Sequence, residues 1–272
     1  MKKITKNYLK KLFEILRKPE MSILPANIAF YFVLALIPLF SIMIFLASSF
    51  SISSDVAINI ITDMFPKTLS QTIISILSTD NINSHINILL FIAFIIATNG
   101  TYAIVVSSNT LYKIDKRDVV KDRIKSVILL IIILMLLLFL IAVPILGMQI
   151  LEMLKNIDAL ANNIPKLMFI YNILKWPMTF LIIYFNLKLI YAIAPSKQVN
   201  SGDTIEGAFF TTVCWVFATA LFSYYVNNFA RYDALYGNLS TIIILMIWIY
   251  AISFIFVLGM AINTLKYNNQ EK

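Results

Sequence analysis

The stretch "YGNLSTIIILMIWIYAISFIFVLGMAIN", Tyr236 to Asn263, decides the fold, because it carries no formal charge over its whole length. An α-helix rises about 1.5 Å per residue, so roughly 20 apolar residues cross the hydrocarbon core of a bilayer. The stretch is therefore predicted to be a membrane-spanning helix. It also contains Gly237, Asn238 and Gly259, which an anchor does not need. These residues indicate either packing seams between helices or the walls of a path.

The composition of the whole chain is that of a membrane protein. Hydrophobic residues make up 60% of the 272 residues and charged residues only 13%, whereas soluble domains are about half apolar and about a quarter charged. We therefore predict an all-α fold: a polytopic bundle of six transmembrane helices, with short amphipathic helices in the N-terminal leader and the outer loops. The predicted spans are about 24–50, 86–111, 126–150, 167–194, 205–228 and 238–265.

The positive charges gather in two stretches. The leader Met1–Pro19 contains seven Lys and Arg residues, and Lys113–Lys125 contains six more. Because cytoplasmic segments of membrane proteins are enriched in Lys and Arg, this pattern predicts that both termini are cytoplasmic. The net charge of +8 is then explained by topology and the lipid surface, and no nucleic-acid partner is expected. The predicted organisation is a basic amphipathic leader (1–20), a transmembrane domain (21–266) and a cytoplasmic tail (267–272).

Two segments outside the spans have an amphipathic pattern. In the leader, Ile4, Tyr8, Leu12 and Leu16 recur at helical spacing between lysines, as in a helix lying on an anionic membrane surface. The long loop after the first span contains two short amphipathic segments broken at Pro66. Three interpretations of this loop stay open: a lid, a re-entrant hairpin, or two interfacial helices that cover the bundle.

Polar residues inside the spans are the candidates for function, because an unsatisfied polar group in lipid is costly. The pair Asn99-Gly100 is the most suggestive, since Gly permits close helix approach and Asn offers both a donor and an acceptor. It indicates either helix packing or a kink that faces a substrate. The candidate substrate-pathway residues are Asn27, Asn99, Gly100, Asn109, Lys175, Tyr236, Gly237, Asn238 and Asn263.

Lys175 is the candidate with a formal charge well inside a predicted span. Its stem can extend to the interface beside Trp176, as lysines near helix ends do. Alternatively, Lys175 is a buried cation that binds an anionic head group. The residues leave both interpretations open.

No motif points to catalysis. The chain contains no G-x-S-x-G, no H-E-x-x-H and no phosphate-binding glycine loop. The lone Cys214 and the lone His85 form neither a disulfide nor a cluster of metal ligands within one chain. Asp203 and Glu206 suit the first turn of a helix, where acids favour the helix dipole. We expect no catalytic residue, no metal and no cofactor.

Four stretches together resemble one known family: "LPANIAFYFVLALIPLF", "NSGDTIEGAFFTTVCW", "YYVNNFARYDALYGNLSTIIILMIWIY" and "LGMAIN". They are similar to the YihY/BrkB family of bacterial inner-membrane proteins, the virulence factor BrkB-like proteins that were formerly labelled ribonuclease BN-like. The similarity covers most of the chain and is densest from Tyr191 to Asn263. It rests on residues that include Ala29, Tyr31, Pro38, Asn99, Gly100, Asn109, Pro195, Gly207, Tyr232, Gly237, Trp248, Gly259 and Asn263.

The resemblance implies a six-helix bundle in the bacterial cytoplasmic membrane with cytoplasmic ends. It also implies a role in envelope integrity and the movement of lipids or other solutes. The ribonuclease label is disfavoured, because the chain has no acidic or histidine cluster to bind a metal or activate water. The chain departs from the family at two positions: Ala261 replaces a common glutamate, and Ala35 replaces a common serine. If that glutamate couples transport to ions, this chain lacks the coupling or supplies it elsewhere.

Three functions follow in order of preference. The first is a transporter or lipid-translocating protein for an amphipathic or anionic envelope substrate, with membrane lipids as partners. The second is a non-catalytic membrane scaffold for envelope integrity, and the third is a membrane-embedded enzyme. Gly100, Gly147 and Gly259 permit close helix contact within one chain or in a homo-oligomer.

Overall fold

The computed structural model describes residues 13–49, 82–115, 118–155, 164–228 and 240–270. These residues form six long α-helices and no strand, which confirms the all-α prediction. The predicted leader helix lies mostly outside the described residues, and the long loop after the first span lies outside them entirely. The helices are α2 (Glu20–Ser49), α5 (Ile82–Leu111), α6 (Val119–Lys155), α8 (Ile164–Ile193), α9 (Ile205–Asn228) and α11 (Ser240–Gln270).

The surface of these helices is that of a membrane protein. Among the residues whose side chains are described, three segments are long and apolar enough to cross a bilayer: Lys166–Ile193, Ile205–Val226 and Ile242–Leu265. Glu20–Ala35 is a shorter apolar helix. Large apolar side chains point outward, and Trp176 is 71% exposed. A water-soluble protein rarely exposes so much contiguous apolar surface, so these faces are suited to lipid.

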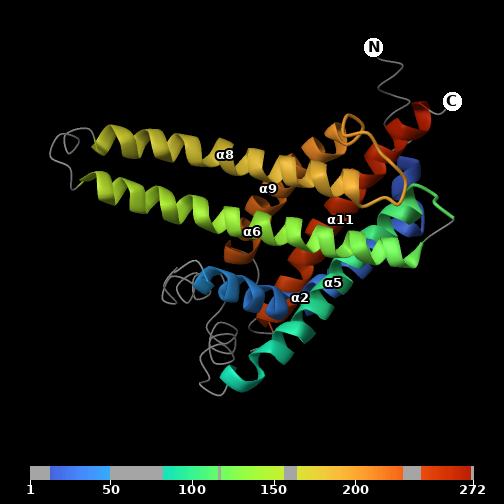
Figure 1. Cartoon of the computed structure of the whole chain (residues 1–272). Coiled ribbons are helices and arrows are strands. Elements are labelled where there is room, and N and C mark those ends of the chain that lie inside the picture. The colour runs from blue at the N-terminus through green and yellow to red at the C-terminus, as the bar shows by residue number, and fades with distance from the viewer. Residues whose placement is uncertain (1–12, 50–81, 116–117, 156–163, 229–239, 271–272) are drawn as a thin grey trace, which may run out of the picture.

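Helices that follow one another in the chain pack together, and so do the first and last of them, α2 and α11 (Figure 1). α2 packs against α5, α6 against both α8 and α5, and α11 against both α9 and α2. The first turn of α2, the last turn of α11, and the ends of α5 and α8 that lead into α6 and α9 lie at the same end of the molecule. The basic stretch Lys113–Lys125 joins α5 to α6 at this end. We call it the loop end.

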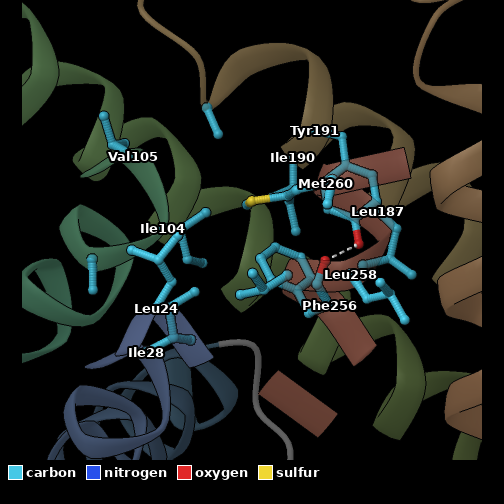
Figure 2. Close-up of a cluster of buried hydrophobic side chains, with 14 of the residues drawn as sticks. Leu24, Ile28, Ile104, Val105, Leu187, Ile190, Tyr191, Phe256, Leu258 and Met260 are labelled. Atoms are coloured by element: carbon cyan, nitrogen blue, oxygen red, sulfur yellow. Dashed lines mark hydrogen bonds between the residues drawn. The ribbon is translucent and has the colours of Figure 1, made fainter. Parts of the chain in front are cut away.

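The best-packed core also lies toward the loop end. Figure 2 shows Leu24 and Ile28 of α2 facing Ile104 of α5, with Leu187 of α8 and Met260 of α11 beyond them. Because the helices alternate in direction, early residues of α2 meet late residues of α5, α8 and α11. This packing brings polar residues of the same turns into contact at the loop end.

Candidate functional site

A buried polar cluster joins three parts of the chain at the loop end. It consists of Asn109 in α5, Asp122 in α6 and Ser196, which follows α8. Asn109 Nδ2 donates hydrogen bonds to Asp122 Oδ2 at 3.2 Å and to Ser196 Oγ at 2.7 Å. The backbone N–H of Ser196 donates to Asn109 Oδ1 at 2.7 Å, and its hydroxyl donates to Asp122 Oδ1. We call these three residues the loop-end cluster.

Local structure places the cluster. α5 ends in a Schellman motif, in which Ile114 N donates to Asn109 O at 2.9 Å and Lys113 N donates to Thr110 O at 3.2 Å. Lys113 has a φ of 54°, a left-handed conformation that most L-residues avoid. This turn reverses the chain between the last turn of α5 and the first turns of α6. Asn109 and Asp122 are thereby brought face to face.

Asp118 caps the start of α6 in the way expected of an N-cap aspartate. Its Oδ1 accepts hydrogen bonds from Val120 N at 3.1 Å and Lys121 N at 3.2 Å, and its other oxygen lies 3.3 Å from Lys121 Nζ. The backbone hydrogen bond from Lys121 and the Lys121 ammonium hold the pKa of Asp118 below its ordinary value of 3.8. The cap fixes where α6 begins and hence which face Asp122 occupies.

Further bonds anchor the cluster to its surroundings. Lys125 Nζ donates to the Pro195 carbonyl, one residue before Ser196. Ser126 Oγ donates to Asp122 O at 2.7 Å, and Thr101 Oγ1 donates to Ser126 O at 2.7 Å. Asp122 is only 1% exposed. Its carboxyl group is therefore satisfied by an amide and a hydroxyl, as a buried polar group requires.

This chemistry suits a closure between helices better than a reaction. The carboxylate, amide and hydroxyl of the cluster saturate one another and leave no activated nucleophile. In the part of the chain that the structure describes, no three His, Cys, Asp or Glu side chains come together to hold a metal ion. Opening the loop end would require these hydrogen bonds to break together.

Asn99 and Gly100 precede Asn109 in α5, farther from the loop end, and have different neighbours. Asn99 Oδ1 accepts a hydrogen bond from Arg123 Nη1 at 2.9 Å. Gly100 faces α2: a Cβ atom there would lie 3.6 Å from Tyr31 O, an ordinary contact. A cavity of about 10 Å³ lies beside Gly100, which is roughly the space that one water molecule needs.

A second polar seam joins α9 to α11. Gly207 N donates to Asn263 Oδ1 at 2.8 Å, and a Cβ atom on Gly207 would lie 2.2 Å from Gly259 O. Tyr191 OH is 2.7 Å from Thr211 Oγ1 and donates to Phe256 O at 2.9 Å (Figure 2). Within the described part of the chain, Asn263 Nδ2 has no hydrogen-bond partner. This seam needs glycine because the two backbones approach so closely.

The remaining candidates are not brought together with the loop-end cluster. Asn27 is half-buried in α2. Lys175 Nζ donates to Asn172 Oδ1 at 3.1 Å and lies 5.8 Å from the Trp176 ring, on the outward surface of α8. Tyr236, Gly237 and Asn238 lie outside the described residues. The predicted candidates therefore fall into separate environments rather than one continuous lining, as far as the described residues extend.

Sequence reasoning missed Asp122 and Ser196. Asp122 stood among the charged residues of Lys113–Lys125 and was treated as part of that loop. A signal was present, because Asp122, Ser126, Leu129 and Ile133 recur at helical spacing and all four are buried. Ser196 carried no such signal, since it lies after a helix and 74 residues from Asp122.

Comparison with known proteins identifies the family. The model of the family described as virulence factor BrkB matches residues 12–272. The chain belongs to this family. The BrkB family was predicted from the sequence, and the match over almost the whole chain confirms that prediction.

Relatives match this chain over different lengths. The ribonuclease-like protein YfkH of Bacillus subtilis is 28% identical over 269 residues, which cover 97% of each chain. UPF0761 membrane proteins match over shorter stretches. One from Glaesserella parasuis is 33% identical over 82 residues, or 30% of this chain and 29% of the relative. Another from Haemophilus influenzae is 33% identical over 70 residues, or 26% of each chain. No solved structure matches.

Proposed function

We propose that this BrkB-family membrane protein is a transporter or lipid-translocating protein for an amphipathic or anionic substrate of the cell envelope. The observation that supports the proposal most is the loop-end cluster, in which Asp122 is buried among three parts of the chain. A buried carboxyl group is costly unless it is hydrogen-bonded, and in this proposal it is kept at the loop end because the contact it makes has to open and close.

In this proposal the loop-end cluster is the closed cytoplasmic gate of the route. The hydrogen bonds of Asn109 to Asp122 and Ser196 hold α5, α6 and the start of the α8–α9 connection together. Breaking them would separate the ends of these helices at the loop end. Rearrangement of one group of helices against another is how many transporters change access. Asp122 would also supply the ionisable group that Ala261 does not.

The proposed location is the bacterial cytoplasmic membrane, with several spans and both termini in the cytoplasm. The position of the basic stretch Lys113–Lys125 at the loop end supports this orientation. Membrane lipids are the proposed partners, and nucleic acid is not. Fusion of a reporter to each terminus tests the orientation, since a cytoplasm-specific reporter should be active at both ends.

A non-catalytic scaffold is the second candidate, and one observation favours it. Three of the candidate asparagines, Asn99, Asn109 and Asn263, each form a hydrogen bond with a neighbouring helix. The cavity beside Gly100 is far too small for a lipid. A bundle that stays packed in this way would hold envelope proteins or the bilayer together without moving anything.

We also propose that the protein is not an enzyme, although the relative YfkH is named ribonuclease-like. The support is chemical: hydrolysis of RNA needs a metal cluster or an activated base, and the sequence has one His and no acidic pair inside a span. Purified protein incubated with labelled RNA should leave it intact. Cleavage that survives removal of contaminating nucleases would contradict this proposal.

Reconstitution into liposomes tests the proposed function. Vesicles containing fluorescent phosphatidylglycerol, with and without the protein, are treated with a membrane-impermeant quencher. The proposal predicts that protein-containing vesicles lose the inner-leaflet fraction of the signal faster than empty vesicles. An equal rate with this lipid and with other anionic amphiphiles would favour the scaffold instead.

A further inference from the structure

The guanidinium group of Arg123 is held in place on the outer surface of the α5–α6 pair. Its Nη1 donates to Asn99 Oδ1 at 2.9 Å, and its carbon Cζ lies 4.0 Å from the centroid of the Tyr102 ring. Asn99 and Tyr102 are three residues apart and so share one face of α5. A guanidinium has five N–H donors, and the bond to Asn99 uses one of them. The rest of the group is oriented but still able to bind a ligand.

Arg123 has no carboxylate partner within the described residues. The ion pair found there joins Lys121 to Asp118. Asp122, next to Arg123 in the chain, points inward and is bound by Asn109 and Ser196. Lys125 turns to the Pro195 carbonyl. Among the residues that the structure describes, none therefore compensates the positive charge of Arg123, and a cation beside lipid favours an anionic partner.

The position of the guanidinium suits a lipid. Arg123 lies in the second turn of α6, before the predicted span 126–150, where lipid phosphates are expected. Its side chain reaches Asn99 on the neighbouring helix α5. Ile95 and Phe91, about one and two turns before Asn99 in α5, are exposed, as is Ile128 on α6. Acyl chains can lie on these side chains while a phosphate meets Arg123.

We propose that Arg123, positioned by Asn99 and Tyr102, binds the phosphate group of an anionic phospholipid on the outer surface of α5 and α6. Arginine is suited to this task, because its planar group donates two parallel hydrogen bonds to phosphate oxygens. The site concerns binding alone. It stands whether the bound lipid is moved across the membrane or stays in place, so its failure and that of the proposed function are separable.

Native mass spectrometry of the full-length protein in detergent tests the site. Phosphatidylglycerol is added in steps, and the fraction of protein carrying one lipid is measured. We expect Arg123→Gln to weaken the first binding step about tenfold, since charge-assisted hydrogen bonds are lost. The matched control is Lys121→Gln, which removes one positive charge from the same turn of α6 but from a side chain that is 77% exposed and paired with Asp118. This control should bind like the wild type.

Two further arms decide the remaining outcomes. Arg123→Lys keeps the positive charge and serves as the test variant if Arg123→Gln fails to fold. We expect it to bind the lipid more weakly than the wild type, because lysine lacks the planar fork of arginine. An excess of inorganic phosphate should not displace the lipid, because it lacks acyl chains. Equal binding by the wild type and both Arg123 variants would overturn the proposal. Displacement by inorganic phosphate would overturn the assignment to a lipid.

Discussion

Asn109 and Asp122, thirteen residues apart in the chain, bond side chain to side chain at 3.2 Å between α5 and α6, and both are buried. Ser196, 87 residues after Asn109, completes the contact by bonding to both. Two helices and a connection are thus fixed through one carboxylate. The stability of the loop end should depend on this group more than on the exposed charges around it.

The substitution Asp122→Ala tests this dependence. It removes the acceptor for both the Asn109 amide and the Ser196 hydroxyl, and leaving buried donors unsatisfied costs about 1–3 kcal/mol. The thermal unfolding midpoint in detergent should fall clearly. Asp118→Ala, at an exposed cap on the same helix, should lower the midpoint less. A larger fall for Asp118→Ala would contradict the assigned importance of the loop-end cluster.

Gly259→Ala and Gly100→Ala form a matched pair. A Cβ atom on Gly259 would lie 2.0 Å from Thr211 Oγ1 and 2.6 Å from Tyr191 OH, so the seam must open. Overpacking of this kind costs about 1–3 kcal/mol. At Gly100 the nearest atom would be 3.6 Å away, so alanine should be tolerated there. The measurement is the thermal unfolding midpoint in detergent, which should be lower for Gly259→Ala. Equal midpoints for the two variants would show that the α9–α11 seam is less tight than described.

Tyr191→Phe removes one hydroxyl from the core. That hydroxyl bonds to Thr211 and to Phe256 O, and a typical buried hydrogen bond contributes about 1 kcal/mol. The variant should unfold at a lower temperature than the wild type. Tyr250→Phe, on the exposed side of α11, is the control and should behave like the wild type. An unchanged midpoint for Tyr191→Phe would mean that the hydroxyl contributes little.

Asp118 predicts a pH dependence. Its pKa in the folded protein is lowered from 3.8, so its charged form stabilises the fold above the unfolded pKa, and this contribution is lost as the pH falls through the lower folded value. The wild type should therefore be more stable than Asp118→Asn at pH 7. The difference should shrink as the pH falls below 3.8. A difference that stays constant would rule out the charge of Asp118 as its cause.

The sequence predicted the helices well because hydrophobic length is a strong signal. Each predicted span falls largely on one helix. Gly259 was noted as more than an anchor requires, and Asn263 was a candidate. Asn109 was a candidate from the sequence, but its hydrogen-bond partners were not predicted. Their identity depends on which helices meet, and residues 109 and 196 come together only in the folded chain. Whether any candidate lines a pathway remains a prediction.

The arrangement of Lys175 also could not be derived from the sequence. One open interpretation extends its ammonium to the interface and the other makes it a buried cation that binds an anionic head group, and the choice between them depends on its neighbours. The structure gives it Asn172 and two aromatic rings on an outward surface. Arg123 shows the reverse case: it was counted only as part of a basic stretch, yet its side chain reaches the Asn99 that the sequence had singled out.

The central claim is that the loop-end cluster closes a route for an amphipathic substrate. Its most direct test measures translocation of fluorescent phosphatidylglycerol in liposomes containing wild type, Asp122→Asn or Asp118→Asn. An asparagine at 122 has one acceptor oxygen where the carboxylate uses two, one for Asn109 and one for Ser196, so the closure should loosen and translocation should become several-fold faster. Asp118→Asn should match the wild type. If all three proteins leave the lipid where it was, as empty vesicles do, the route does not exist.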